Sequence, residues 1–238
     1  MILAAHQLHY LPWLRYFHKI AHCDTFVVLD NIQFNKNGWQ NRNKIKTVMG
    51  SAVLTVPVIQ KFQQSLADVR IDTKQPWRRK HWGALQSNYR KAPHFKEHEE
   101  FFGRLYEREW ERLNDLNYEI LFYLLKTLGI KVKVVRSSEL PLKGESSGRL
   151  VGICRNLGAG TYLTGAHAVQ VYLDLKPFEE AGIALSHQEF ECPAYPQLFP
   201  EAGFLPELSI VDLLFNCGPK SLEILLRGSP SKVREAAS

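Results

Sequence analysis

The sequence predicts an α/β fold: a three-layer, Rossmann-like and mainly parallel sheet, with helices on both faces and a helical insertion in the middle of the chain. Three observations predict it. Short apolar runs alternate with helical patterns at both ends of the chain, which is typical of a sheet covered on two faces. The first two apolar runs are separated by a helix-length crossover, which favours a parallel pair. Three successive helical patterns, at about 76–128, separate the two alternating halves.

The first half of the chain supplies two strands, a loop, a hairpin and the insertion. Pro12 suits the first turn of a helix. Asn114 is a good cap for the last insertion helix, and Gly129 a stop signal. The expected elements are a strand at 2–5, a helix after Pro12, a strand at 25–29, a polar and aromatic loop at 31–47, a hairpin of 44–48 with 52–58, and helices at about 76–91, 95–112 and 114–128.

The second half returns to strand–helix alternation. The expected elements are a strand at 131–135, a helix at 148–157, a strand at 161–164, a helix at 168–181, a strand at 183–190, and helices at 208–216 and 219–227. Residues 229–238 are small and polar, so we expect a flexible tail. The remaining residues, 1–228, are expected to form a single domain that includes the insertion.

Composition and charge narrow the class of protein. The four cysteines form no CxxC pair, which argues against a disulfide scaffold or a Cys-rich zinc module and for a reducing compartment, the cytoplasm. The most apolar run is too short to cross a membrane. The net charge of +6 is uneven, because residues 1–100 hold 15 basic and 7 acidic side chains. Such a positive half favours an anionic partner: a phosphate ligand, a nucleic acid or an acidic carrier protein.

Three segments are expected at the carboxyl ends of strands, where open α/β sheets bind ligands: 6–10, 30–42 and 136–147. In the first, His6 and Gln7 follow the first strand. A histidine there can act as a general base, or the pair can be satisfied inside a turn. His6 and His9 also match the spacing of the HxGH element of nucleotidyltransferases, but Leu8 replaces its glycine.

The second segment combines a carboxylate with aromatic, amide and basic groups. Asp30 can orient a histidine, bind a sugar hydroxyl, hold a metal or simply cap the loop. Trp39 can stack on a base or sugar, and Arg42 can clamp a phosphate with two hydrogen bonds. Bunched Trp, Asn, Gln and Arg side chains favour a ligand over a solvated loop.

Further candidates lie in the second half. Ser146 or Ser147 can cap the following helix, or the helix N-terminus can hold a phosphate. Asp212 and Asn216 stand one turn apart on an apolar helix, where structural capping competes with substrate binding. The thiol of Cys217 is expected to be buried and inert, because a helix C-terminus disfavours a thiolate.

A basic and aromatic run, Trp77-Arg78-Arg79-Lys80-His81-Trp82, falls in the first insertion helix. A basic face over 74–91 can serve a binding or scaffold protein. We expect it to be a solvated helix face with both tryptophans packed inward, rather than a nucleic-acid surface.

Several motifs together carry a resemblance to a known family. They are His6-Gln7-x-x-Tyr10-Leu11-Pro12-Trp13, Val28-Leu29-Asp30-x-x-Gln33-Phe34, Gly38-Trp39-x-Asn41-Arg42, Asn88-Tyr89-Arg90-Lys91-Ala92-Pro93, Leu157-Gly158-Ala159-x-x-Tyr162-Leu163-x-Gly165, Tyr195-Pro196-Gln197 and Ser209-x-x-Asp212-Leu213-Leu214-Phe215-Asn216-x-Gly218. In this order, over residues 2–218, they resemble the WbqC-like family. The chain departs from the family pattern at Leu8-His9, where Pro-Asn is usual, so His6 is the better catalytic candidate.

The resemblance implies a bacterial, cytoplasmic protein of surface-polysaccharide (O-antigen, lipopolysaccharide) or natural-product assembly. The implied chemistry is acyl or aminoacyl transfer to an amino group, such as that of a nucleotide-linked amino sugar. The donor would be an acyl-CoA or the thioester of an acidic carrier protein, with no further cofactor and no metal implied. We expect His6 and Asp30 to be catalytic. The expected substrate-binding residues are Gln7, Tyr10, Trp13, Gln33, Trp39, Asn41, Arg42, Ser146, Ser147, Gly165, Tyr195, Gln197, Asp212 and Asn216.

Overall fold

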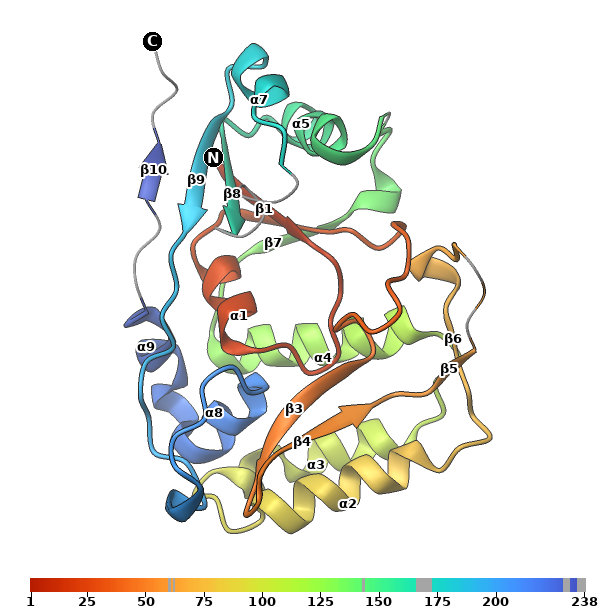
Figure 1. The fold of residues 1–238 in the computed structure, drawn as a ribbon, viewed down its shortest axis with the longest axis vertical. Helices are drawn as coiled ribbons and strands as arrows, with labels where there is room; N and C mark the ends of the chain where they lie inside the picture. Colours follow the sequence, from red (N-terminus) through yellow and green to blue (C-terminus); the bar gives the residue numbers. More distant parts are fainter. Residues whose placement is uncertain (60, 62, 143, 166–172, 229–231, 235–238) are drawn as a thin grey trace.

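The fold is built on a six-stranded sheet with the order β10-β9-β8-β1-β2-β7 (Figure 1). A computed structural model describes residues 1–59, 61, 63–142, 144–165, 173–228 and 232–234. Five strands run parallel: β1 (Ile2–His6), β2 (Thr25–Val28), β7 (Lys133–Arg136), β8 (Thr161–Gly165) and β9 (Ala184–Gln188). The edge strand β10 (Lys232–Arg234) is antiparallel to β9. The parallel sheet and its helices confirm the predicted Rossmann-like fold.

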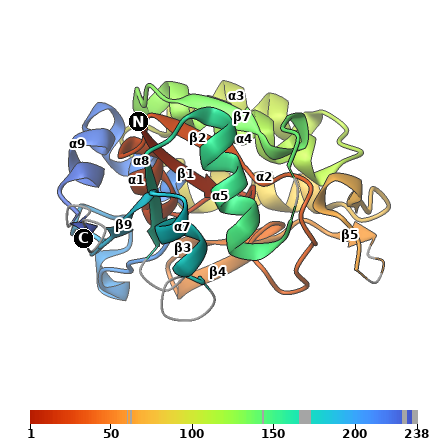
Figure 2. The ribbon, with the colours of Figure 1, turned by 90° about the horizontal axis from the view of Figure 1, so that it is seen from above.

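Two separate cores cover the two faces of the sheet. On β1, Leu3 and Ala5 belong to the core beneath α5 (Ser146–Leu157) and α7 (Lys176–Glu180), whereas Ala4 belongs to the core beneath α1 (Leu14–Ala21) and α4 (Leu113–Leu128). This division follows from the alternation of side chains along a strand. Figure 1 shows α5 and α7 on one side of the strands and α1 and α4 on the other, and Figure 2 shows α5 lying over the sheet.

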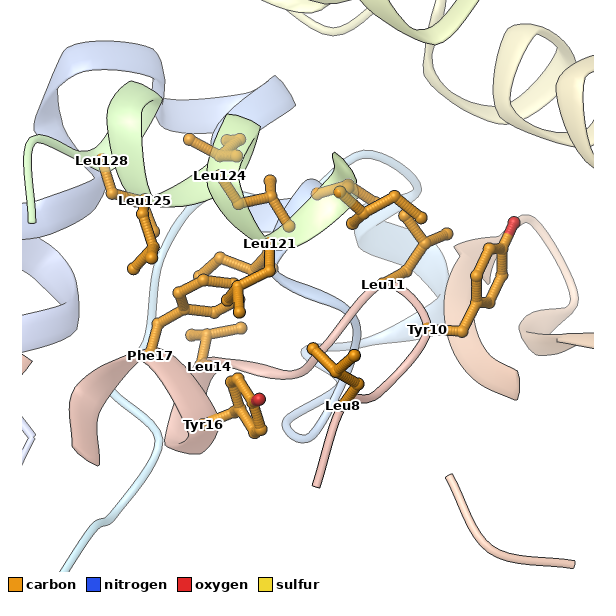
Figure 3. Close-up of a cluster of buried hydrophobic side chains, with 14 of the residues drawn as sticks. Leu8, Tyr10, Leu11, Leu14, Tyr16, Phe17, Leu121, Leu124, Leu125 and Leu128 are labelled. Carbon is orange, nitrogen blue, oxygen red and sulfur yellow. The ribbon is translucent and has the colours of Figure 1, made fainter. Parts of the chain in front are cut away.

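Helices α1 and α4 meet through their apolar stripes (Figure 3). Leu14 and Phe17 of α1 point toward Leu121 and Leu124 of α4, and all four side chains are buried. Helix α4 ends where Gly129 takes a left-handed conformation, with φ of +70°, as predicted. The predicted cap differs: α4 begins after Arg112, and Asn114 instead donates from Nδ2 to the Asp30 carbonyl, 3.1 Å away.

A long insertion separates β2 from β7. It contains the antiparallel pairs β3 (Arg42–Thr47) with β4 (Gly50–Thr55) and β5 (Val58–Ile59) with β6 (Arg70–Ile71), then α2 (Trp77–Tyr89), α3 (Phe95–Glu107) and α4. The hairpin and the three predicted helices are therefore present. Helix α3 ends before the predicted residue 112, because the backbone is extended at Arg108 and the indole of Trp110 donates back to the carbonyl of Leu105.

The C-terminal part packs beside α1 and α3 through α8 (Ile210–Cys217) and α9 (Ser221–Leu226) (Figure 1). Of the helix predicted at 168–181, residues 168–172 lie outside the described residues, and α7 begins only at Lys176. Within the predicted tail, 232–234 form β10, while 229–231 and 235–238 lie outside the description. No helix among the described residues is both long and apolar enough to traverse a bilayer.

Candidate functional site

The candidate site lies at the carboxyl edge of the parallel sheet, where the strand order reverses. β1 pairs with β2 on one side and with β8 on the other, and open α/β sheets bind ligands at such a switch point. A cavity of about 300 Å³ lies there. Its lining residues are Ala5, His6, Gln7, Lys19, Leu29, Ile32, Ser146, Ser147, Arg149, Leu150, Tyr162, Thr164 and Leu173.

His6 is the last residue of β1 and is half-buried. Its Nδ1 lies 3.1 Å from the Gln7 carbonyl. Because a carbonyl only accepts hydrogen bonds, the proton of the neutral ring sits on Nδ1, and Nε2 carries the free lone pair. Burial, with smaller effects from Lys19 and His9, holds the pKa of His6 well below 6.5. The ring is therefore neutral at pH 7 and able to take a proton.

Lys19 brings a buried positive charge to the cavity. It lies on α1, is 7% exposed, and donates from Nζ to the Ala5 carbonyl at 3.2 Å. Burial lowers the pKa of Lys19 to about 8. No carboxylate pairs with it among the described residues. A buried cation without a counter-charge is unfavourable in a folded protein unless a ligand supplies one.

The start of α5 adds Arg149 and the N–H groups that a helix leaves without an intrahelical partner at its first turn. Arg149 donates from Nη2 to the side-chain oxygen of Asn31, and its buried Nε has no partner among the described residues. Ser146 and Ser147 are the first two residues of this twelve-residue helix. Neither caps it as predicted, because the N-cap is Glu145 without a side-chain bond and Ser147 Oγ instead accepts from the Asp174 N–H at 2.9 Å.

The cavity therefore selects for negative charge. Lys19 and Arg149 are its cations, the helix N-terminus of α5 adds a partial positive charge, and no Asp or Glu is among its described lining residues. Leu29, Ile32 and Leu150 supply an apolar wall. An anionic group beside a small apolar portion fits this arrangement.

Comparison with known proteins identifies the family. The sequence model of the WbqC-like protein family matches residues 7–224. The chain belongs to the WbqC-like protein family. It is 35% identical over 223 residues to Rv1507c, an uncharacterized protein of Mycobacterium tuberculosis (strain ATCC 25618 / H37Rv), a match that covers 92% of this chain and 95% of that protein. No solved structure matches the chain significantly. The resemblance indicated by the motifs is thus confirmed.

The motifs of this WbqC-like chain do not all converge on the cavity. His6, Gln7, Ser146 and Ser147 line it. Gly165 ends β8 at the same edge of the sheet. The other predicted substrate-binding residues lie elsewhere: in the insertion loop, in the core, or in a cluster that joins the insertion to the C-terminal part.

Asp30 is buried but is not paired with His6. Its carboxylate accepts hydrogen bonds from Ser137 Oγ at 3.0 Å, from the Ser138 N–H at 3.0 Å and from Ser138 Oγ at 2.7 Å, and Tyr118 Oη lies 3.4 Å away. His6 is not among its hydrogen-bond partners in the described part of the chain. Asp30 thus fastens the end of β2 to the turn that follows β7, so the expected orientation of His6 by Asp30 is absent from this arrangement.

Arg42 and its neighbour Asn41 lie away from His6. Asn41 and Arg42 line a second cavity, not the one that holds His6, so the two predicted phosphate-binding groups, Arg42 and the helix start at Ser146, do not line one cavity. The Arg42 guanidinium and the Lys44 ammonium lie 5.6 Å and 5.7 Å from the centroid of the Trp39 ring. The Trp13 ring packs against Trp39 with centroids 5.2 Å apart.

Gln33 is exposed and forms a backbone bridge with Ser65. Tyr10 is fully buried: its hydroxyl lies 2.8 Å from His81 Nδ1 and 2.5 Å from Tyr106 Oη. In this conformation it cannot touch a ligand, and it ties the start of the fold to the insertion. His9 lies outside the cavity, and burial lowers its pKa to about 3.

The motifs that contain Tyr195 and Asp212 form a buried polar cluster. Asp212 accepts from the hydroxyls of Tyr89 and Tyr195, each at 2.8 Å. Lys46 Nζ donates to Gln197 Oε1 at 3.1 Å and to the Gly203 carbonyl at 2.6 Å. Asn216 Nδ2 donates within α8 to the Asp212 carbonyl at 2.7 Å. These residues hold the C-terminal part against β3 and α2, and none of them lines the His6 cavity.

Two further sequence features can be placed. Cys217 is buried, and burial raises the pKa of its thiol. Trp77 is packed inward on α2, whereas Trp82 is half-buried and stacks on Phe95 with ring centroids 5.9 Å apart. Arg78 is paired with Glu109 at 3.2 Å.

The sequence reasoning missed Lys19 and Arg149 as site residues. Lys19 stands three residues after Tyr16 and one before Ile20, inside the apolar stripe of its helix. A lysine on a buried stripe is a signal that a ligand or a buried carboxylate is near. Arg149 lies two residues beyond the third segment, 136–147, and its position in the first turn of a helix after a glycine-containing loop was the available clue.

Proposed function

We propose that this WbqC-like protein is a transferase of surface-polysaccharide or natural-product assembly in the cytoplasm. It binds an anionic, phosphate-bearing amine substrate, such as a nucleotide-linked amino sugar, in the cavity at the carboxyl end of β1. It transfers an acyl or aminoacyl group from a thioester to the amine. The observation that carries this proposal is that one cavity holds a neutral, proton-accepting His6 together with two cations that form no ion pair with the described residues.

The cations give the substrate its position. Lys19 and Arg149 would contact the phosphate, with the N–H groups at the start of α5 completing its hydrogen bonds. A phosphate beside Lys19 would supply the counter-charge that the described residues lack. Its negative charge would also raise the pKa of His6 from its depressed value toward neutrality, which is the range in which a general base is most effective.

His6 then handles the proton. The amine nitrogen attacks the thioester carbonyl carbon, a C–N bond forms, and Nε2 of His6 takes the proton that the nitrogen loses. The C–S bond breaks as the tetrahedral intermediate collapses, and the protonated His6 returns the proton to the thiolate. The products are an amide and a free thiol, so atoms and charge balance without a further reactant.

The test is thiol release by the purified protein. Acyl-CoA and acylated carrier thioesters are supplied as donors with nucleotide-linked amino sugars as acceptors, and the free thiol is followed with a colorimetric reagent. We expect His6→Gln to lower turnover by about 100-fold or more. His22→Ala, which changes a histidine outside the cavity, is the matched control and keeps its turnover.

Either of two results contradicts the proposal. Turnover by His6→Gln close to that of the unmodified protein removes His6 from the chemistry. Absence of thiol release with every donor, together with no thermal stabilisation by the nucleotide sugars, removes the transferase assignment. A ligand present at about 100 times its dissociation constant stabilises a protein by about 2.7 kcal/mol, so binding itself is readily detected.

A further inference from the structure

A second cavity lies in the insertion, beside the strand pair β3–β4. Its volume is about 170 Å³, and it is lined by Phe34, Lys36, Asn37, Asn41, Arg42, Thr55 and Val58. Drug-sized ligands occupy pockets of about 300–1,000 Å³, so this cavity has room for a chemical group rather than for a whole cofactor.

Arg42 lines this cavity, and one of its hydrogen-bond donors has no partner among the described residues. Its Nη2 donates to the Asn37 carbonyl, and its guanidinium carbon lies 5.6 Å from the centroid of the Trp39 ring. These two contacts hold the guanidinium at the cavity. Its Nε is buried and has no partner among the described residues. A buried donor without an acceptor is unfavourable, and an anionic oxygen entering the cavity would satisfy it.

The charged side chains that line this cavity are both positive. Lys36 and Arg42 are its ionisable residues, and neither forms an ion pair with any residue that the structure describes. Asn37, Asn41 and Thr55 add neutral polar groups. Two cations, neutral polar groups and an arginine with a free donor are the features of a phosphate site.

Residues of one loop line both cavities. Ile32 lines the cavity of His6, whereas Phe34, two residues later, lines the second cavity. Gln7 lines the first, and its Oε1 accepts a hydrogen bond of 2.6 Å from Nε2 of Gln40, which directly precedes two residues of the second, Asn41 and Arg42. Residues two positions apart on this loop thus line the two cavities, and one hydrogen bond links their neighbouring side chains.

We propose that the Arg42 cavity binds the phosphate of the acyl donor, at the end of a pantetheine arm whose thioester reaches His6. The inference rests on the proposed function, because a transfer reaction needs separate places for donor and acceptor. Both CoA thioesters and carrier-protein thioesters have this phosphate. The acceptor phosphate then occupies the cavity of Lys19 and Arg149.

The first test is site-resolved protection of arginines in the unaltered protein. The protein is treated with phenylglyoxal with and without inorganic phosphate, and the modified peptides are quantified by mass spectrometry. We expect phosphate to protect both Arg42 and Arg149. Arg155, exposed on the same helix as Arg149 and outside both cavities, is the matched control and stays unprotected. Protection of Arg149 without Arg42 overturns this inference but leaves the proposed function standing, and protection of neither overturns both.

The second test separates the two sources of the phosphate. Arg42→Ala is assayed for thiol release with an acyl-CoA and with an acylated carrier protein. We expect KM to rise by about ten- to a hundredfold for both donors, the usual effect of losing a hydrogen bond to a charged group. A rise for only one donor, or for neither, overturns the assignment, because the phosphate that the donors share would not be what Arg42 binds. Thermal unfolding of the variant, unchanged from that of the unaltered protein, shows that the fold is intact.

Discussion

Replacing Lys19 by methionine gives the sharpest test of how the cavity is built. The ammonium of Lys19 is buried, and it has one hydrogen bond, to the Ala5 carbonyl, and no carboxylate partner in the described structure. Methionine has a similar length and no charge. We expect Lys19→Met to be more stable than the unaltered protein at pH 7 and to lose the stabilisation that phosphate gives.

The magnitude follows from the pKa of Lys19, which burial lowers from 10.5 to about 8. A change of this size corresponds to about 3 kcal/mol of unfavourable interaction of the charged form in the folded state. The variant also loses the hydrogen bond to Ala5, worth about 1 kcal/mol. The net gain is about 2 kcal/mol, or about 4–8 °C in Tm for a chain of this size.

The dependence on pH distinguishes this cause from simple repacking. Below pH 8, Lys19 is charged in both states and the whole penalty is present. Between pH 8 and 10.5 the folded state releases the proton before the unfolded state does, so the stability of the unaltered protein rises with pH. The advantage of Lys19→Met therefore shrinks over this window by about 3 kcal/mol. Lys126→Met, at an exposed position of α4, should show no such change.

The assay is urea unfolding of the three proteins at pH 7 and pH 10, with and without phosphate at pH 7. The reasoning is refuted if Lys19→Met is less stable than the unaltered protein at pH 7, or if the difference between them is the same at both pH values. It is also refuted if phosphate stabilises the variant as much as it stabilises the unaltered protein. Agreement would identify a side chain that is retained for binding although it lowers stability.

Two further substitutions probe the parts that hold the site in place. Asp212→Ala leaves the hydroxyls of Tyr89 and Tyr195 without their acceptor, so the free energy of unfolding should fall by about 2–4 kcal/mol. Equal urea midpoints for the variant and the unaltered protein would show that the cluster adds nothing to stability. Phe17→Ala opens a void between α1 and α4 and should lower the unfolding free energy by about 3–5 kcal/mol; a loss below 1 kcal/mol in the same measurement would mean that the void collapses.

Local patterns were enough to predict the sheet and its helices. The apolar run before His6 predicts β1, and the apolar stripe that follows predicts α1. The turn between them marks the edge of the sheet. Element ends were less predictable when they depended on distant residues. Asn114 is a residue type that often caps helices, but its side chain donates a hydrogen bond to the carbonyl of Asp30, 84 residues away, instead. Such a contact leaves no trace in the local sequence.

The sequence predicted where the candidate site lies but not all of the residues that form it. The rule for open α/β sheets located the edge with His6, Gln7 and the start of α5. It could not separate Arg42 from that edge, because the direction of a loop and hairpin depends on packing against the rest of the insertion. It also could not reveal that Asp30 is occupied by Ser137 and Ser138, or that Lys19 turns inward from α1.

The insertion between β2 and β7 also has a consequence for how the chain folds. Thr25 pairs with Lys133, so β2 and the edge strand β7 meet only after more than a hundred residues have been synthesised. Closing such a loop carries a larger entropic penalty than closing a short one, and non-local pairing slows folding. We expect the hairpin and the helices of the insertion to form first and to bring β7 back to β2, which leaves the edge of β2 open on the ribosome. The same segment that shapes the second cavity would then set the rate at which the sheet is completed.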